Sequence, residues 1–262
     1  MNIKHSLALL ALASCSLGAH SEQFTCVSFE YPPLIHRGAD GRSEGLAVDI
    51  VGAVFKQMGH TMTVELYPWS RSLASIQAGE KDCIFTIYRS AEREQFLDYS
   101  AESIVPQIVY FYAKKGSSVS FNGDLEALNG LRIGTAYKVN YGPKFEGMRS
   151  RLSIDEAPTI EQNFKKLAIG RVDLVPSNLY TAASTMEQPG VKEFATDIVK
   201  LPVPVENVPS YIGFAKLKKL ATLRNSFDTE FRKFVASGEY KRLLEKYKLA
   251  DTPEFAKFLR QK

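Results

Sequence analysis

Histidine and cysteine are scarce in this chain, and neither residue type forms a cluster. The 262 residues include four histidines and three cysteines. A zinc site needs three or four such ligands, usually at short and regular spacings. No such spacing occurs, and two of the histidines, His5 and His20, lie in the N-terminal segment. We therefore expect no metal site, and no motif in the sequence calls for a cofactor.

The chain also lacks a concentration of positive charge. Its formal net charge is +4, from 33 Lys and Arg against 29 Asp and Glu. The basic residues are scattered, and the pairs Lys165-Lys166 and Lys218-Lys219 do not extend into a stripe. Because a nucleic-acid interface needs a basic stripe or patch, we expect no nucleic-acid partner.

Long apolar runs are absent except at the N-terminus. Leu7 to Leu17 is almost purely apolar or small and follows the charged start at Lys4. Small residues surround a cleavage point after Ser21. This pattern is typical of a secretory signal peptide and is too short to cross a bilayer as a helix. Residues 1–21 are therefore predicted to be removed on export to the periplasm, which leaves a net charge of +3.

A second interpretation of the same segment involves lipidation. Leu12-Ala13-Ser14-Cys15 resembles a bacterial lipobox, in which Cys15 would be lipidated and become the new N-terminus. Apolar and small residues continue past Cys15 to Ala19, which favours simple cleavage.

Two cysteines remain after the leader, Cys26 and Cys83, and both fall in predicted strands. An oxidising compartment would allow them to form a disulfide. The alternative is a pair of buried thiols in neighbouring strands, since free cysteine packs as a small hydrophobe. The sequence does not fix the Cα separation that a disulfide requires, so both interpretations remain open.

An internal repeat is the strongest pattern in the chain. The segment IQAGEKDCIF, which starts at Ile76, returns 91 positions later as LAIGRVDLV from Leu167. Each copy contains an amphipathic run, a glycine that can end a helix, a spacer, an aspartate and an apolar strand. The glycines and aspartates are Gly79 and Asp82, then Gly170 and Asp173. Two similar α/β lobes with a binding cleft between them are the predicted outcome.

Strands and helices alternate along the rest of the chain. A hairpin-like loop is expected at 37–42, and an extended return segment at 199–209. Such alternation favours mostly parallel sheets flanked by helices, an α/β fold. Strands are predicted at 24–29, 62–67, 83–87, 108–113, 131–134 and 211–215, and helices at 47–58, 70–78, 145–152, 220–237 and 240–247.

Several short motifs occur in a characteristic order over nearly the whole chain. They are GLAVDI from Gly45, Pro68-Trp69, Gly79 to Asp82, Glu92-Arg93 through Ser100, LNGLRIG from Leu128, Gly170 to Asp173, and Gly238 through Tyr247. In these motifs the chain resembles the family 3 periplasmic solute-binding proteins, the receptors of polar-amino-acid ABC importers.

The resemblance implies a two-lobed periplasmic-binding-protein fold that closes on its ligand. Lobe 1 would be discontinuous, built from residues 22–103 and 211–262, and lobe 2 would comprise 107–208. Two hinge strands would cross near 103–107 and 208–212. The implied partners are a small-molecule ligand and a membrane ABC permease, and the protein is expected to be a monomer.

The Glu-Arg step supplies the main candidate for ligand binding. The resemblance implies that Arg93 holds the ligand's carboxylate, because a guanidinium can donate two parallel hydrogen bonds; a solvated arginine is the alternative. Trp69 and Tyr31 are predicted to wall the cleft, or else to pack in the core. Arg71 lies in the first turn of a helix, where the macrodipole disfavours a cation, so either an anionic ligand or full solvation explains it.

Other candidates come from the second lobe and from departures from the family pattern. Tyr137, Asn140 and Tyr141 follow a strand, where backbone amides and hydroxyls can meet a polar group, although relatives have a short Gly-Ser/Thr turn there. Tyr88 stands where a ligand-binding Thr is common. Asn178 falls five residues after Asp173, where amino-acid binders usually carry the carboxylate that holds the ligand's ammonium. An α-amino acid is thus the leading ligand class, with a non-amine carboxylate or another small polar solute as the alternative.

Two other functions remain open on this fold. A cleft enzyme of the cyclohexadienyl-dehydratase type would need a general acid, for which Glu30 and His36 are candidates without a supporting motif. A sensory receptor would deliver its closed form to a membrane signalling protein. We expect a transport receptor with no catalytic residues.

Overall fold

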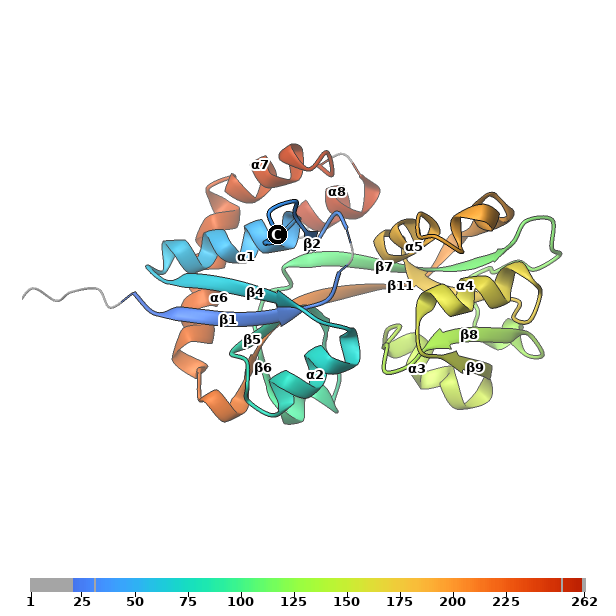
Figure 1. Cartoon of the computed structure of the whole chain (residues 1–262), viewed down its shortest axis with the longest axis horizontal. Helices are drawn as coiled ribbons and strands as arrows, with labels where there is room; N and C mark the ends of the chain where they lie inside the picture. Colours follow the sequence, from blue (N-terminus) through green and yellow to red (C-terminus); the bar gives the residue numbers. More distant parts are fainter. Residues whose placement is uncertain (1–20, 31, 251, 261–262) are drawn as a thin grey trace, which may run out of the picture.

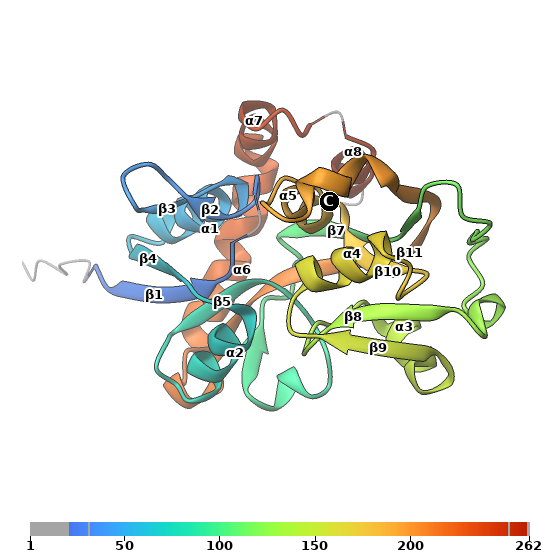
Figure 2. The same cartoon turned by 45° about the vertical axis from the view of Figure 1, so that its right-hand side comes forward.

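Two lobes joined by two long strands make up the molecule (Figure 1, Figure 2). The computed structural model describes residues 21–30, 32–250 and 252–260. Most of the predicted signal peptide, including Cys15, lies outside these ranges, as does Tyr31. Within them, every helix is too short or too polar to cross a bilayer.

The elements follow the predicted alternation closely. The strands are Gln23–Ser28 (β1), His36–Arg37 (β2), Ser43–Glu44 (β3), Thr61–Leu66 (β4), Cys83–Tyr88 (β5), Leu97–Tyr99 (β6), Val105–Lys114 (β7), Arg132–Ala136 (β8), Ser153–Ala157 (β9), Val175–Asn178 (β10) and Ile198–Ala215 (β11). The helices are Leu46–Gln57 (α1), Trp69–Gln77 (α2), Pro143–Met148 (α3), Ile160–Ala168 (α4), Leu179–Met186 (α5), Ala221–Ala236 (α6), Glu239–Lys246 (α7) and Pro253–Leu259 (α8).

The first lobe is built on the parallel strands β4, β1 and β5, with β11 antiparallel to β5. Apolar residues of α1, α6 and α7 form its main core, in which Phe55, Phe227 and Tyr240 are completely buried. Ile76 of α2 packs into a separate cluster with Ile84 and Ile87 of β5. This is the layered α/β arrangement that buries a parallel sheet.

Strands β7 and β11 connect the lobes. They pair antiparallel, with Val105 opposite Ser210 and Gln107 opposite Val208. The main sheet is therefore mixed, in the order β10-β7-β11-β5-β1-β4, while β8 and β9 of the second lobe pair in parallel.

A disulfide links β1 and β5, two neighbouring parallel strands of the first lobe. Cys26 of β1 and Cys83 of β5 are register partners, with their Cα atoms 4.4 Å apart. Both residues are completely buried. Of the two interpretations that the sequence allowed, the bridged pair is the one found.

The internal repeat has a common hydrogen-bond pattern in the two lobes. Helices α2 and α4 both end at the repeat's glycines, with φ of 71° and 74°. The backbone N–H of Asp82 donates to the Thr25 carbonyl, and the Asp82 carboxylate accepts from the Thr25 N–H at 2.8 Å. Asp173 makes the same two bonds to Arg132. Each aspartate thus ties the turn after the helix to the first strand of its own lobe.

Candidate functional site

A cavity of about 660 Å³ is lined by residues of both lobes. The first lobe contributes the start of α2 and the end of β5, and the second contributes residues 136, 137 and 139–141, the start of α4 and the end of β10. Within the described residues, no group of His, Cys, Asp or Glu side chains is placed to hold a metal ion. A cavity of this size, lined by side chains and backbone groups of both lobes, has dimensions that suit a small molecule.

The repeat explains why the cavity has similar walls on its two sides. Residues 67–70 and residues 158–161, which are 91 positions apart, both line it at the starts of α2 and α4. Thr86 and Ser177 have the same spacing and also line it. Helix N-termini have backbone N–H groups without intrahelical partners, so both walls offer hydrogen-bond donors to a ligand.

Arg93 is the dominant charge in the cavity wall. It opens the short 3-10 turn Arg93–Gln95 and is only 5% exposed. Its Nη1 donates to the Tyr88 carbonyl at 3.0 Å and its Nη2 to the Lys138 carbonyl at 3.3 Å. The guanidinium carbon lies 5.2 Å from the centre of the Trp69 ring.

Among the described residues, Arg93 has no ion-pair partner for its buried charge. Burial lowers the pKa of its guanidinium, and Arg93 forms no ion pair with a carboxylate of the described residues. The carboxylates whose charge acts on it, Glu92 and Glu146, do not line the cavity. Since a buried charge is costly without a partner, the cavity is prepared for an anion at this point.

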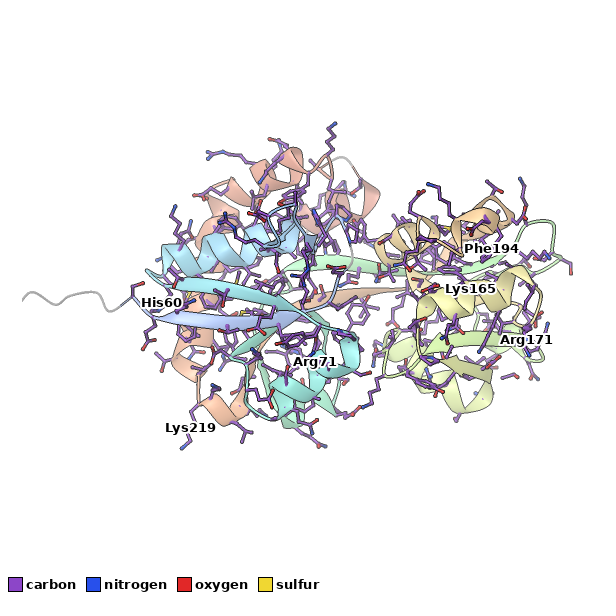
Figure 3. The ribbon with its side chains drawn as sticks, in the orientation of Figure 1. His60, Arg71, Lys165, Arg171, Phe194 and Lys219 are labelled. Carbon is purple, nitrogen blue, oxygen red and sulfur yellow. A yellow bond between two sulfur atoms is a disulfide. The ribbon has the colours of Figure 1, made fainter. Side chains whose placement is uncertain are left out.

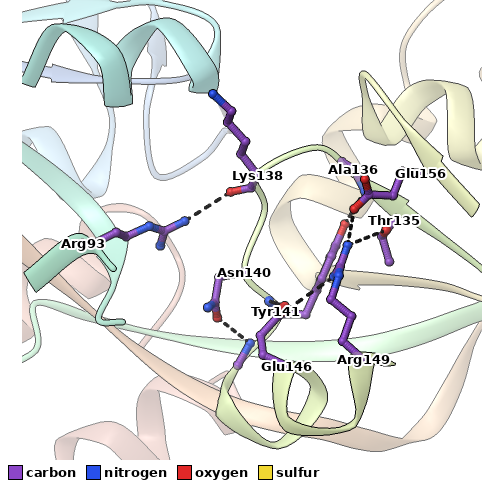
Figure 4. A network of polar contacts seen from close by, with 10 residues as sticks. Arg93, Thr135, Ala136, Lys138, Asn140, Tyr141, Glu146, Arg149 and Glu156 are labelled. Carbon is purple, nitrogen blue, oxygen red and sulfur yellow. Dashed lines mark hydrogen bonds and ion pairs between the residues drawn. The ribbon is translucent and has the colours of Figure 1, made fainter. Parts of the chain in front are cut away.

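A backbone carbonyl of the second lobe bridges to the first. The Lys138 oxygen accepts a hydrogen bond from the Trp69 Nε1 at 3.0 Å. It also accepts one from Arg93, which Figure 4 shows. Lys138 has φ of 58°, a left-handed conformation that is uncommon for a residue other than glycine. The two lobes are thus in hydrogen-bonded contact across the cavity.

The loop that carries Lys138 is held by its own side chains. The Tyr141 hydroxyl accepts from the Ala136 N–H at 2.8 Å, and Asn140 Oδ1 accepts from the Gly142 N–H at 2.9 Å (Figure 4). Tyr141 is 2% exposed, and burial raises the pKa of its hydroxyl. The hydroxyl is therefore neutral, and the loop has a defined shape at the cavity wall.

A neutral polar network lies on the same wall as Arg93. Gln107 Oε1 accepts from the Tyr88 hydroxyl at 2.8 Å and from Asn178 Nδ2 at 3.0 Å. Gln107 Nε2 donates to the Thr86 carbonyl at 3.3 Å. Asn178 Oδ1 accepts from the Thr181 N–H and so caps α5. Burial raises the pKa of the Tyr88 hydroxyl, which keeps it protonated.

Thr86 has an unusual backbone conformation. Its φ is 61°, although a β-branched residue is strongly disfavoured in the left-handed region. The position coincides with a register shift between β5 and β11, opposite Tyr211 and Ile212. Strained residues of this kind persist where surrounding contacts hold them, often at binding sites, and the hydrogen bond from Gln107 is one such contact.

The cavity brings together most of the residues predicted from the sequence. Those that line it are Trp69, Tyr88, Arg93, Tyr137, Asn140, Tyr141 and Asn178. Arg71 is not among them, because its exposed guanidinium stacks 4.1 Å from the centre of the Tyr67 ring (Figure 3). His36 is also outside the lining, with its Nε2 3.1 Å from a Glu44 oxygen, whereas Glu30 lines the cavity.

Sequence analysis did not identify Thr86, Gln107 or Thr181 as cavity residues. A glutamine within a strand belongs to no motif, and no sequence signal marks a left-handed threonine. The wall at residues 158–161 could have been found by applying the offset of 91 to Pro68-Trp69.

Comparison with known proteins agrees with this architecture. A probable histidine-binding protein of Neisseria gonorrhoeae is 23% identical over 220 residues, which cover 83% of this chain and 80% of that protein. A histidine kinase sensor domain with similarity to periplasmic binding proteins superposes with a TM-score of 0.71 at 18% identity, covering 87% of this chain and 96% of the domain. The substrate-binding protein of an amino acid ABC transporter gives 0.66 at 21% identity, covering 87% and 99%.

The family model for bacterial extracellular solute-binding proteins, family 3, matches residues 25–250. This range includes most of both lobes, the connecting strands and every described residue of the cavity wall. The chain therefore belongs to the family 3 bacterial extracellular solute-binding proteins.

Proposed function

We propose that this protein is a periplasmic receptor that captures a small carboxylate-bearing solute by lobe closure and delivers it to an ABC importer. The observation that carries the proposal is Arg93, a buried cation in the cavity wall with no ion-pair partner among the described residues. A carboxylate would supply the missing charge and accept two parallel N–H bonds.

The hydrogen-bond inventory of Arg93 supports this proposal. A guanidinium carries five N–H donors, and Arg93 uses two of them on the carbonyls of Tyr88 and Lys138. Donors therefore remain for a ligand. The Trp69 ring lies next to the guanidinium, and Phe29 packs edge-on against that ring at 5.1 Å. Both aromatic residues line the cavity and shield a bound carboxylate from water.

The similar proteins support delivery to an importer. Two of them are named as binding proteins, and one of these two belongs to an amino acid ABC transporter. A sensory role is the second candidate, because a histidine kinase sensor domain shares the fold. An enzyme of the cyclohexadienyl-dehydratase type would depend on Glu30, whose carboxylate oxygen lies 3.7 Å from Arg37 Nε.

Native mass spectrometry of protein purified from its own periplasm tests the receptor role directly, since a captured carboxylate should be carried over.

Ligand binding should bring the lobes together. The hydrogen bonds from Trp69 and Arg93 to the Lys138 carbonyl support a closed arrangement of the lobes, and a bound carboxylate would stabilise it. We expect the radius of gyration from small-angle X-ray scattering to fall when saturating ligand is added. Identical scattering curves with and without ligand would contradict lobe closure.

The Trp69 hydrogen bond to Lys138 should contribute to the closed state. Trp69→Phe keeps an aromatic ring beside Arg93 but removes the Nε1 donor. One neutral hydrogen bond is worth about 1 kcal/mol, so we expect ligand affinity measured by calorimetry to fall by roughly 2- to 10-fold. An unchanged affinity would show that the contact does not favour the bound form. Trp69→Ala, which also removes the ring, should cost more.

A further inference from the structure

We infer that the ligand is a carboxylate without an ammonium group on the adjacent carbon, and that Gln107 is the residue that sets this preference. The inference rests on the proposed function, because it assumes that a ligand carboxylate binds Arg93. It concerns the polar network that Tyr88 connects to Arg93. In this network the side-chain amide of Gln107 is bonded to Tyr88, Thr86 and Asn178.

An α-ammonium would have to be satisfied close to Arg93. In an α-amino acid the ammonium nitrogen and the carboxylate are bonded to the same carbon, so the groups that hold them must be neighbours. Tyr88 links the two parts of this wall, since its carbonyl accepts from Arg93 and its hydroxyl donates to Gln107. An ammonium brings three N–H donors and a positive charge, and it therefore needs acceptors, at least one of them anionic.

The acceptors on this wall are already in use. Gln107 Oε1 accepts two hydrogen bonds, from Tyr88 and Asn178. Asn178 Oδ1 caps the N-terminus of α5, and the Thr86 carbonyl accepts from Gln107 Nε2. Gln107 Nε2 thus occupies the Thr86 carbonyl, an acceptor that would otherwise be open to a ligand's amine, and Asn178 turns an N–H donor toward the same point.

No member of this network is anionic. The raised pKa of the Tyr88 hydroxyl keeps it neutral, and the other side chains that meet here are amides. The two carboxylates of the cavity lining, Glu30 and Glu161, pair with Arg37 and Lys165. Their side chains are 55% and 33% exposed, so water screens their charges.

The buried part of the cavity is therefore positive overall. A zwitterion would place its ammonium against a neutral network whose acceptors already receive hydrogen bonds, and near the Arg93 cation, which costs desolvation and repulsion. A monoanion avoids both costs. The walls next to Arg93 are aromatic, from Phe29, Trp69 and Tyr88, which suits a flat or apolar body on the carboxylic acid.

Matched pairs of compounds test the inference on the unmodified protein. Each pair consists of an α-amino acid and the acid that lacks only its α-amino group, such as phenylalanine with 3-phenylpropanoate and histidine with 3-(imidazol-4-yl)propanoate. Affinities are measured by thermal shift and calorimetry. We expect the deaminated member to bind roughly 10- to 100-fold more tightly.

The possible outcomes separate this inference from the proposed function. Tighter binding of the amino acid within a pair overturns the inference and leaves carboxylate capture intact. If no carboxylate in the panel binds and native mass spectrometry recovers a ligand without one, the proposed function fails, and the inference fails with it.

Two variants test Gln107 itself. Gln107→Ala combined with Asn178→Asp removes the amide, opens space and adds an anion, while aspartate can still cap α5. We expect this double variant to reverse the order within each pair, in favour of the amino acid, by about tenfold or more. Asn178→Asp alone should strengthen amino-acid binding less, because Gln107 can turn its amide and donate to the new carboxylate.

If the double variant binds amino acids no better than Asn178→Asp does, Gln107 does not control the preference. Thermal unfolding of both variants without ligand shows whether they are folded. If the double variant does not fold, the result with the matched pairs on the unmodified protein decides the inference.

Discussion

Replacing Arg93 with glutamine should abolish carboxylate binding. The side chain is buried in the cavity wall, where a bidentate pair with a carboxylate is poorly screened by water. We expect a loss of at least about 100-fold in affinity, which corresponds to about 3 kcal/mol. Calorimetry with the tightest-binding acid of the matched panel measures it, and the thermal shift caused by that acid should disappear as well.

An exposed arginine outside the cavity provides a matched control for Arg93→Gln. Arg171 is an exposed arginine of the second lobe that does not line the cavity (Figure 3), and Arg171→Gln should leave the affinity within about twofold. The ligand-free stability of Arg93→Gln is equally informative. Because the buried cation has no ion-pair partner among the described residues, its removal should leave the melting temperature unchanged or higher. Unchanged affinity in Arg93→Gln would remove this residue from the site.

Local patterns in the sequence were sufficient to predict most of the architecture. In each copy of the repeat, a glycine ends a helix and an aspartate follows three residues later. The roles of both residues depend only on neighbouring positions in the sequence, so the repeat at Gly79 and Gly170 was visible without a structure. The same is true of α1 and of the hairpin of β2 and β3. These features depend on backbone conformation and periodicity, which short segments largely determine.

Several elements, β9 and α5 among them, were not predicted, and two other parts of the fold were missed or divided for identifiable reasons. The prolines of residues 199–209 suggested a segment separate from the following strand, yet both belong to β11. Pairing with β7 continues past Pro204 by shifting register on either side of it. Helix α8 was not predicted, although Thr252-Pro253 is a typical helix start and Phe255 and Phe258 are spaced for one buried face.

The polar part of the site required the structure because its members come from distant elements. Gln107 lies on β7, Tyr88 at the end of β5 and Asn178 at the end of β10. Only the arrangement of these strands in the sheet places the Gln107 amide between the Tyr88 hydroxyl and the Asn178 amide. For Arg71 the helix-dipole argument was sound, but it did not take into account the nearby Tyr67 ring. This ring gives the cation a favourable partner, and Arg71 itself does not line the cavity.

The second large effect should come from the disulfide between Cys26 and Cys83. The two residues are 57 positions apart in sequence, and cross-linking a loop of this length restricts the unfolded chain by about 4 kcal/mol in the chain-entropy estimate. We expect Cys26→Ala combined with Cys83→Ala to lower the free energy of unfolding by roughly 2–4 kcal/mol. The melting temperature should fall by on the order of 10 °C. Equilibrium denaturation and calorimetry of the ligand-free protein measure both quantities.

Reductant separates the effect of the bridge from the effect of losing two sulfur atoms. Both cysteines are completely buried, so reduction has to be tested during reversible denaturant unfolding, when the bridge becomes accessible. The unmodified protein should lose stability when reductant is present, whereas the double alanine variant should not respond. Ligand affinity should stay within about twofold, because neither cysteine lines the cavity. Equal stability of the unmodified protein with and without reductant would mean that the bridge adds nothing, and that the packing of β1 against β5 is sufficient to hold the first lobe.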